Sequence, residues 1–506
     1  LKLWLKLRTT SYNLLNLEIL EAGASPLHMP PFLGAGTFIL LVQIAGVFAS
    51  EEDFEWHGDC TGKFRFPKKF PVGGDPQHFN GITINRTCFS NGSYDRYELG
   101  NPVFFIGDWG GLNWGIGPVP ADHTKTHDPF KRRAYNWAVD HNAQWRVSGA
   151  FNARGKFRNP DYVLNVGDNF YWGGVDCHCG NMYARCDTKQ WKYIYEDMWK
   201  GPGIDGKPWL GVLGNHDWGG WQFNKGWDQV IAYSWGGLPE STGRWLQPAI
   251  YWAAPVHYPG FNVDWLFCDS NIFDVRESPW WDPEHNICGA QHSGTYAGAG
   301  CGHSGPYSVF DCSKWFGNLW DRQQGWLDAK LKDSVQQKVD WQFVVTHFPP
   351  WWGEADWKHL AWQYGIDMFV TGHVHRQDVL EQWDWRNQFK PTVVIITGGG
   401  GGITSEYFPD NNGNDDQYGF VDCTLWKDKV KVEMISHGGQ IRKTHVLTKR
   451  EAAWKPESFK GYFSIPEEEK AWAKLHPPKE ESKHKDDKKD ESKEDNDGKK
   501  DKDVSV

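Results

Sequence analysis

Five short apolar runs in this chain each end on Gly-Asp, Gly-Asn or His, and this repeated pattern limits the folds open to it. Continuous runs rich in Val, Ile and Phe are typical of strands buried on both faces. A sixth run ends in five glycines. The runs are 102-PVFFIGDWGG-111, 161-DYVLNVGDNFY-171, 208-PWLGVLGNHDW-218, 341-WQFVVTHFPPW-351, 366-IDMFVTGHVH-375 and 392-TVVIITGGGGG-402.

Segments between these runs favour helices, at 131–145, 188–200 and 319–333. Strand, loop, helix and strand in alternation indicate an α/β fold. Three further runs at 420–426, 430–436 and 441–447 predict a closing antiparallel set. In α/β folds the loops beyond the strand ends meet in one crevice, so we expect their side chains to form a common site.

The strand-end loops supply carboxylate, amide, phenol and imidazole side chains and no thiolate. This donor set suits Fe, Mn or Zn and not a soft-metal thiolate site. His373 and His375 are two residues apart, so in an extended loop they can turn to two different metals. Asp168 is placed to bridge them, and a Tyr171 phenolate suits Fe(III). The candidate residues are Asp108, Asp168, Tyr171, Asn215, His216, His347, His373 and His375.

These motifs, in this order, resemble those of the metallophosphoesterases. Tyr171, three residues after Asp168, narrows the resemblance to the purple acid phosphatases, and 167-GDNFYWGGV-175 is most similar to their single-domain, tartrate-resistant type. The resemblance spans residues 99–448. It implies an α/β (α+β) four-layer sandwich, in which two mixed β-sheets are flanked by helices and the metal site lies at strand-end loops.

The resemblance also implies a role for each residue of the set. Asp108, Tyr171 and His375 would bind Fe(III), while Asn215, His347 and His373 would bind a divalent Fe, Zn or Mn ion. Asp168 would bridge the two ions, and His216 would contact the substrate phosphate. The implied reaction is hydrolysis of phosphate monoesters by a metal-bound hydroxide, with His216, Asp168 and Asn215 as the catalytic residues.

One position departs from the tartrate-resistant pattern. Where that type has a further substrate-side His, this chain has Asp356, with Glu354 and His359 close by. The acid that protonates the leaving group is therefore not assigned. A phosphodiesterase or nucleotide pyrophosphatase on the same metal site is the alternative enzyme, and a non-catalytic polymer-binding protein is the alternative of another class.

Tryptophan is abundant, with 32 residues, and several adjoin the candidate ligands. These residues favour either ordinary core packing or an aromatic wall that stacks a substrate ring. They are Trp109, Trp114, Trp172, Trp218, Trp351 and Trp352. The glycine run 398–402 lacks the Gly-Lys-Ser/Thr ending of a nucleotide-binding loop, so it indicates close backbone approach to the site or a tight turn.

Cysteines and sequons point to an oxidising compartment. All ten Cys follow residue 49, which predicts up to five disulfides, and their spacing fits structural zinc sites poorly. Asn85 and Asn91 head Asn-X-Thr and Asn-X-Ser sequons and are predicted glycosylation sites. We therefore expect a secreted protein, either extracellular or in a lysosome- or vacuole-type compartment.

Composition divides the chain into segments and limits its partners. The formal net charge of −10 argues against nucleic acid, so phosphomonoesters on small molecules or phosphoproteins are the expected partners. No stable membrane span is expected in the mature chain, and oligomeric state is left open. The predicted segments are an upstream non-native stretch at 1–28, a signal peptide at 29–49, a loop-rich extension at 50–98, a catalytic domain at 99–448, a linker at 449–475 and a disordered charged tail at 476–506.

Overall fold

A computed structural model describes most of the catalytic region. The described residues are 64, 75–84, 87–89, 99–111, 133–182, 186, 188–220, 223–235, 241–276, 286–289, 300–302 and 304–449. The predicted signal peptide, Asn85, Asn91 and the charged tail all lie outside them. The predicted segment boundaries therefore stay predictions.

Two mixed sheets form the centre of the fold. The first has the strand order β1-β7-β8-β9-β10-β12-β11, with β2 paired to β7. Its middle strands are parallel, and Val370 of β10 pairs with Val345 of β9 and Ile395 of β12. Its strands are β1 (Ile82–Thr83), β2 (Thr87–Cys88), β7 (Trp252–Tyr258), β8 (Phe261–Cys268), β9 (Trp341–Thr346), β10 (Met368–Thr371), β11 (Gln377–Leu380) and β12 (Val393–Thr397).

The second sheet has the strand order β15-β14-β13-β3-β4-β5-β6. Strands β3 to β6 are parallel, and β13 to β15 are antiparallel. All six strand predictions from the apolar runs and the predicted antiparallel set are confirmed. The strands are β3 (Asn101–Ile106), β4 (Val163–Asn165), β5 (Trp209–Gly211), β6 (Trp245–Leu246), β13 (Gly419–Leu425), β14 (Lys429–Ser436) and β15 (Ile441–Thr448).

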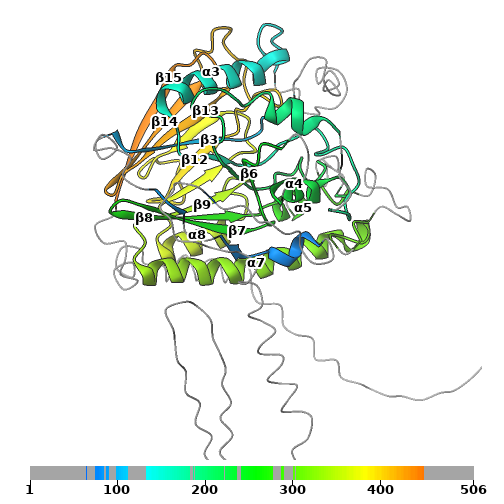
Figure 1. The fold of residues 1–506 in the computed structure, drawn as a ribbon. Helices are drawn as coiled ribbons and strands as arrows, with labels where there is room; N and C mark the ends of the chain where they lie inside the picture. Colours follow the sequence, from blue (N-terminus) through cyan, green and yellow to red (C-terminus); the bar gives the residue numbers. More distant parts are fainter. Residues whose placement is uncertain are drawn as a thin grey trace, which may run out of the picture. The chain divides into compact units, whose positions relative to one another are not determined.

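Helices cover the outer face of each sheet, which gives the four layers seen in Figure 1. Helix α3 packs on β13 and β14, and α7 packs on β8 and α8. The predicted fold class is therefore confirmed. The helices are η2 (Pro76–Phe79), η3 (Asp140–Asn142), α3 (Ala143–Arg158), η4 (Trp191–Glu196), α4 (Trp227–Ser234), α5 (Ile272–Arg276), α7 (Val309–Gln337) and α8 (Glu354–Tyr364).

Tryptophan side chains join the two sheets through the core. The indole N–H of Trp252 in β7 donates to the carbonyl of Gly211 in β5 at 3.1 Å. The indole N–H of Trp341 in β9 donates to Trp426, just beyond β13, at 2.7 Å. A buried Trp thus supplies a large apolar surface and also uses its polar atom. Ordinary core packing accounts for much of the tryptophan content.

The helix predictions are confirmed unevenly. The segment 319–333 lies within α7, and 188–200 contains the π-helical η4. The prediction for 131–145 is wrong for most of its length, because residues 133–139 form turns, Asp140–Asn142 form the short helix η3, and α3 begins only at Ala143. Tertiary contacts override the helical pattern there: Asp140 is fully buried and pairs with Arg133 at 2.7 Å.

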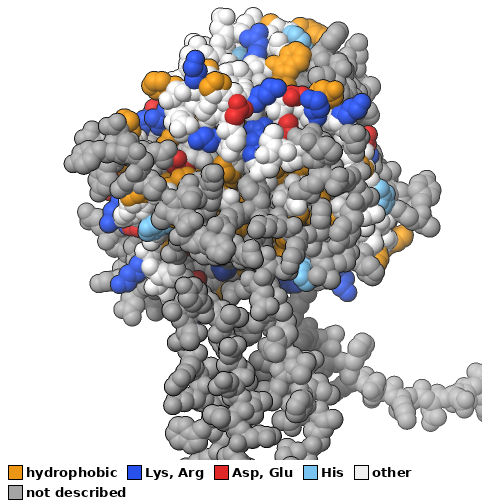
Figure 2. Space-filling view, viewed as in Figure 1, with side chains coloured by type: hydrophobic (Ala, Val, Ile, Leu, Met, Phe, Trp, Pro, Cys, Tyr) orange, Lys and Arg blue, Asp and Glu red, His pale blue; other side chains and the backbone are white. Residues whose placement is uncertain are grey.

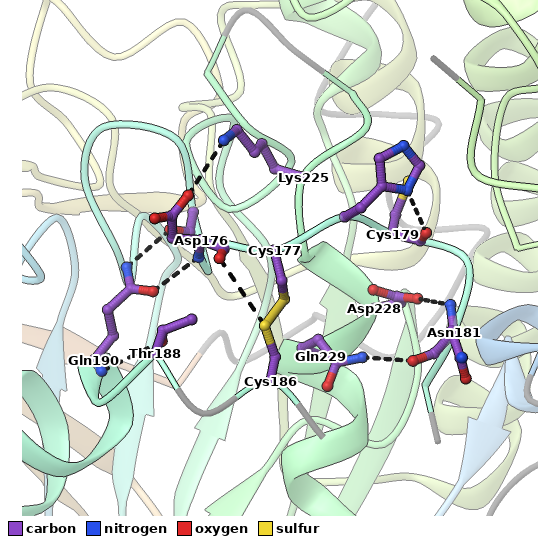
Figure 3. The surroundings of a disulfide bond; sticks show 12 residues. Asp176, Cys177, Cys179, Asn181, Cys186, Thr188, Gln190, Lys225, Asp228 and Gln229 are labelled. Atoms are coloured by element: carbon purple, nitrogen blue, oxygen red, sulfur yellow. Dashed lines mark hydrogen bonds and ion pairs between the residues drawn. A yellow bond between two sulfur atoms is a disulfide. The ribbon is translucent and has the colours of Figure 1, made fainter. Parts of the chain in front are cut away.

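Three disulfides brace the loop after the second ligand motif and the region up to the start of α7: one lies within that loop, one ties it to the segment before α7, and one reaches into α7. They join Cys177 to Cys186, Cys179 to Cys301, and Cys288 to Cys312. Figure 3 shows the first of them beside Asp176 and Lys225, which form an ion pair at 3.3 Å. Cys88 is also disulfide-bonded. The upper limit of five disulfides is corrected, because Cys268 in β8 and Cys423 in β13 are buried free thiols.

Asp228 in α4 holds the turn that carries Cys179 (Figure 3). Its carboxylate accepts the N–H groups of Gly180 and Asn181 at 2.8 and 3.2 Å. Burial nevertheless raises the pKa of Asp228 to about 6. Folding therefore favours the protonated form of this group.

We expect Asp228→Asn to make stability less dependent on pH. The raised pKa of Asp228 contributes stability that is fully present below about pH 4 and is lost as the pH rises through about 6. A shift of about two units corresponds to about 3 kcal/mol. Denaturant unfolding measures the free energy of unfolding at pH 4.5 and at pH 7. The difference between these two values should be smaller in Asp228→Asn than in the wild type, and it should be unchanged in Asp321→Asn, where the replaced side chain is exposed. An unaltered pH dependence in Asp228→Asn would contradict the assignment.

On the face seen in Figure 2, Lys and Arg side chains of the described residues gather in the upper part, with a few Asp and Glu side chains among them. Within the described part of the chain, none of the helices has the length and apolar character needed to cross a membrane.

Candidate metal centre

The predicted ligands come from both sheets and meet at one end of them. Asp108 follows β3, Asp168 and Tyr171 follow β4, and Asn215 and His216 follow β5 in the second sheet. His347 follows β9, and His373 and His375 follow β10 in the first sheet. The two sheets meet where the Gly107 N–H, just beyond β3, donates to Thr397 at the end of β12 at 3.0 Å.

Asp108, Asp168 and His375 form one potential metal site, with one ligand atom from each lying within 4.8 Å of the others. The Tyr171 hydroxyl lies 3.1 Å from Asp108 Oδ1 and 2.8 Å from Asp168 Oδ2. A phenol oxygen is thus added to two carboxylates and an imidazole. The structure brings together the four residues predicted around the ferric ion.

Asp168, His347 and His373 form a second potential site that shares Asp168 with the first. His347 Nδ1 lies 2.8 Å from the Val166 carbonyl, which can only accept, so the proton is on Nδ1. Nε2 faces Asn215 Oδ1 at 3.1 Å and Asp168 Oδ2 at 3.4 Å. Burial acts to lower the pKa of His347, but the Asp168 carboxylate outweighs it and raises that pKa to about 9, so a metal ion bound there would displace a proton from Nε2. A backbone carbonyl that orients a histidine in this way is typical of metal sites.

The polar atoms of the site do not satisfy one another's hydrogen-bonding and charge requirements, and bound metal ions would. His373 Nδ1 is buried and has no hydrogen-bond partner within the described residues. The carboxylates of Asp108 and Asp168 are fully buried, and their ion pairs in the described part of the chain are with His375 and His347. Buried anions need cations close by, and two ions would satisfy both the carboxylates and the orphaned nitrogen.

Burial and mutual repulsion shape the pKa values of these groups. Burial raises the pKa of Asp108 and, together with the two carboxylates, that of the Tyr171 phenol. Burial also acts to raise the pKa of Asp168, but His347 and His216 outweigh it and hold that pKa below its usual range. A bound cation favours the anionic form of any ligand it contacts, so Asp108 and Tyr171 stand to gain most from metal binding.

Three of the ligands occupy an unusual backbone conformation. Asp108, Asp168 and His373 have φ angles of 57°, 53° and 63°, in the left-handed region that non-glycine residues seldom adopt. Each lies directly beyond a strand, where this turn directs the side chain into the site. Such strain persists where the surrounding structure enforces it, and it concentrates at functional sites.

Glycines allow the backbone to approach the ligands. A Cβ on Gly214 would lie 2.1 Å from Asp168 Oδ1, and one on Gly372 would lie 2.4 Å from Asp108 Oδ2. Within the glycine run, a Cβ on Gly402 would lie 2.8 Å from the Tyr171 ring. The interpretation of this run as close backbone approach to the site is confirmed.

Asp217 is a functional candidate that the sequence reasoning missed. Its carboxylate accepts the N–H groups of Gly214 and Asn169 and the Asn169 side-chain amide, at 2.8 to 2.9 Å. It thereby locks the loop of Asp168 to the loop of Asn215. Burial raises the pKa of Asp217 to about 7. Asp217 is the last residue of the Gly-Asn-His-Asp motif, and this position next to Asn215 and His216 could have identified it from the sequence.

His216 is held at the edge of the site by its backbone and its ring. Its N–H donates to Asp168 Oδ1 at 2.9 Å, and its Nδ1 lies 2.5 Å from the Trp172 carbonyl. Since that carbonyl only accepts, Nδ1 carries a proton, and in the neutral ring Nε2 carries the lone pair. The His216 ring lies 4.4 Å from the Tyr171 ring, so the residue is beside the predicted ferric site.

The tryptophans near the ligands divide into two groups. Trp109 and Trp218 are fully buried and donate to Asn165 and Asp269, so they belong to the core. Trp172 and Trp352 are half-buried, with rings 5.1 Å from His216 and 5.2 Å from His373. Trp351 contacts Trp352 at 5.6 Å, and Trp114 lies outside the described residues. An aromatic wall can therefore involve only part of the set.

The position that departs from the tartrate-resistant pattern faces a neighbouring helix. Asp356 in α8 accepts the Trp320 indole N–H of α7 at 3.3 Å. His359 is exposed on the same helix. The structure therefore assigns protonation of the leaving group to neither Asp356 nor His359.

Carboxylate, phenol, amide and imidazole side chains at the adjoining ends of two mixed sheets thus form a potential centre for two metal ions in an α/β fold. The calcineurin-like phosphoesterase family model matches residues 102–377, more than half of the 506-residue chain. The chain belongs to the calcineurin-like phosphoesterase family. Its resemblance to that superfamily is confirmed.

Two relatives are tartrate-resistant acid phosphatases type 5. The rabbit (Oryctolagus cuniculus) protein is 23% identical over 230 residues, which cover 44% of this chain and 57% of the relative. The pig (Sus scrofa) protein is 30% identical over 108 residues, which cover 21% of this chain and 26% of the relative. The matched region thus spans less than two thirds of either relative.

Solved structures of low identity were also matched. GAP50 of the inner membrane complex of Plasmodium is 15% identical with a TM-score of 0.44, covering 72% of this chain and 94% of that one. The purple acid phosphatase PPD1 of yellow lupin (Lupinus luteus) is 16% identical with a TM-score of 0.39, covering 70% of this chain and 55% of that one.

Proposed function

We propose that this protein is a secreted acid phosphatase that hydrolyses phosphate monoesters at a binuclear centre of Fe(III) and a divalent Fe, Zn or Mn ion. The observation that carries the proposal is the Tyr171 hydroxyl, placed within 3.1 Å of both Asp108 and Asp168. A phenolate adds a hard, strongly donating ligand on the side that would hold Fe(III). The disulfides support the expected secretory compartment.

The chain's own residues divide the work of this reaction. Asp108, Tyr171 and His375 would hold one ion, Asn215, His347 and His373 the other, and Asp168 both. When bound, the two cations neutralise phosphate oxygens and lower the pKa of water. Asp217 and the Val166 carbonyl keep the ligand loops and the His347 ring in position.

His216 is suited to contact the phosphate or the leaving oxygen. Its Nδ1 proton is held by the Trp172 carbonyl, so a second proton on Nε2 would be available for donation. An imidazolium there would stabilise charge that develops on the phosphoryl group or protonate the departing alkoxide. The same hydrogen bond fixes the ring orientation before substrate binds.

Tyr171→Phe tests the ferric assignment. The air-oxidised wild-type protein is expected to show a broad visible absorption band from ferric phenolate, and the variant is expected to lose it while keeping its fold by circular dichroism. Elemental analysis should find iron in the wild type. Trp172→Phe, which keeps the carbonyl that holds His216, is the matched control and should retain the band.

A colourless wild-type protein that elemental analysis shows to be fully loaded with metal would contradict the assignment of Fe(III).

Comparison of the hydrolysis rates of p-nitrophenyl phosphate and its bis ester, across a pH series, tests the monoesterase assignment separately. Preference for the bis ester would replace the acid phosphatase by a phosphodiesterase on the same centre.

A further inference from the structure

Three exposed aromatic rings lie on two segments that are hydrogen-bonded to each other, one of which also contacts the ligand loop of His375. Trp137, Tyr407 and Phe408 are 70%, 60% and 58% exposed, and we call them the aromatic platform. Trp137 belongs to the turns at 133–139 that precede η3, while the other two belong to the loop between β12 and β13. Large exposed rings in a chain that buries most of its described tryptophans indicate a binding surface.

A buried polar network fastens these two segments to each other. The Arg133 guanidinium binds both carboxylate oxygens of Asp140 at 2.7 and 2.8 Å and donates to the Ser405 carbonyl at 2.9 Å. The Tyr418 hydroxyl donates to the same Asp140 at 2.6 Å. Charge-assisted, bidentate bonds of this kind hold a rigid geometry.

A second set of bonds brings the backbone of the platform residues together. The Asn136 side-chain amide, next to Trp137, donates to the carbonyl of Pro409, next to Phe408, at 2.9 Å, and to Asn411 Oδ1 at 2.9 Å. Arg146 donates to the Ala138 carbonyl at 2.8 Å and to the Asn411 carbonyl at 3.1 Å. The rings are therefore presented to solvent by a rigid support.

The platform is continuous with the metal centre. The N–H of Glu406, which precedes Tyr407, donates to the His375 carbonyl at 3.1 Å. Arg376, which follows His375, lies 5.7 Å over the Tyr407 ring and donates to its hydroxyl at 3.4 Å. A substrate whose phosphate reaches the metal centre can therefore extend over these rings.

The chemistry around the rings selects among possible partners. Segment 402–418 carries four carboxylates, at Glu406, Asp410, Asp415 and Asp416, and no Lys or Arg. Arg146, Arg376 and Arg442 contact this segment from outside it, so the surface has no excess of positive charge that would attract nucleic acid or anionic lipid. The rings are also too few to form the apolar core of a stable protein interface.

Sugars match the remaining features. Asn411, Asn412 and Asn414 are exposed beside the rings. A primary amide both donates and accepts hydrogen bonds, as a sugar hydroxyl does. An aromatic ring can cover the apolar C–H face of a pyranose, while the hydroxyl groups at the edge of the sugar remain in contact with water. Stacking faces next to several amides thus fit a neutral polyhydroxylated chain.

We propose that the aromatic platform binds the sugar chain of a phosphorylated oligosaccharide and so directs its phosphate ester to the metal centre. This inference rests on the proposed phosphatase function and assigns its substrate class. Trp137 and Tyr407 would stack on sugar units adjacent to the phosphorylated one. The platform would act on substrate affinity and leave the chemical step unchanged.

The test compares esters with and without a sugar chain. The full chain is assayed with glucose 6-phosphate, mannose 6-phosphate, malto- and mannopentaose bearing a terminal 6-phosphate, a phosphoserine peptide and p-nitrophenyl phosphate. At least one phosphorylated pentasaccharide is expected to exceed its monosaccharide in kcat/KM by about tenfold or more. Trp137→Ala with Tyr407→Ala should remove that advantage through KM and leave the p-nitrophenyl phosphate rate unchanged.

A matched control is available on the β11–β12 loop. Trp383 and Trp385 are 73% and 86% exposed and lie in the loop that follows β11, on the opposite side of that strand in the chain from His375. Trp383→Ala with Trp385→Ala should leave every rate unchanged. Equal kcat/KM for pentasaccharide and monosaccharide, or a platform-dependent advantage of the phosphopeptide instead, would overturn the proposal.

A separate binding measurement distinguishes failure of the platform from failure of the phosphatase. If the wild-type protein hydrolyses none of these esters, the proposed function is wrong. Calorimetric titration with the same phosphorylated pentasaccharides then tests whether the aromatic platform binds the sugar chain. Binding that is lost in the Trp137→Ala, Tyr407→Ala variant supports it, and binding that is equal or absent in both proteins overturns it.

Discussion

Replacing Asp168 by Ala is expected to lower kcat/KM for p-nitrophenyl phosphate by about 10⁴-fold or more. Asp168 is the residue shared by both potential metal sites, and its carboxylate also accepts the His216 N–H at 2.9 Å. Its removal would take away the negative charge that both ions are proposed to share and would loosen the loop that positions His216. A loss of about 5 kcal/mol of transition-state stabilisation corresponds to this change in rate.

Metal content distinguishes this explanation from simple unfolding. Elemental analysis should find about two metal ions per wild-type chain and at most one in Asp168→Ala, while the far-ultraviolet circular dichroism stays the same. Asp228→Asn is the matched control, because it also removes a buried carboxylate but lies in α4 outside the site. An Asp168→Ala variant with two ions and normal activity would contradict the bridging role.

Replacing His216 by Ala is expected to lower kcat by about 10²- to 10³-fold with little loss of metal. Its ring lies beside Tyr171 and is held through Nδ1 by the Trp172 carbonyl, so Nε2 can serve as a proton donor. General acid catalysis by a positioned side chain contributes an effect of about this size. Metal content and the visible band should both be retained, unlike in Asp168→Ala.

The pH profile of the His216 variant supplies an independent readout. If the imidazolium assists the leaving group, the variant should lose one limb of the kcat profile and should lose less activity with a leaving group of low pKa. His216→Asn, which keeps a side-chain donor, should recover part of the rate lost on monoesters. A purely structural role for His216 predicts equal losses for all leaving groups and no recovery.

Much of the candidate site followed from local pattern. Runs such as 102-PVFFI-106 are buried on both faces and therefore consist of apolar residues, which made their ends easy to find. Since parallel strands present their carboxyl ends at one edge, the polar residues at those ends were expected to meet. Asp108, Asp168, Tyr171, His347 and His375 do lie together.

The errors arose where distant segments decide the structure. Segment 131–145 has a helical pattern, but Arg133 and Asp140 are bound to Ser405 and Tyr418, more than 250 residues away. Cys268 and Cys423 were counted as potential disulfide partners, but they lie in different sheets. Periodicity carries no information about such contacts, because it reports only how each segment alternates between core and solvent.

The sequence by itself determined the strands, the donor atoms at their ends and the family, since these depend on residue types at short spacing. Only the tertiary structure decided that β3 and β12 meet, so that ligands from two sheets enclose one centre. It also decided that Asp217 locks two ligand loops and that Trp109 is core while Trp137 is exposed. Burial and hydrogen bonding depend on neighbours brought together by folding, and these are distant in the chain.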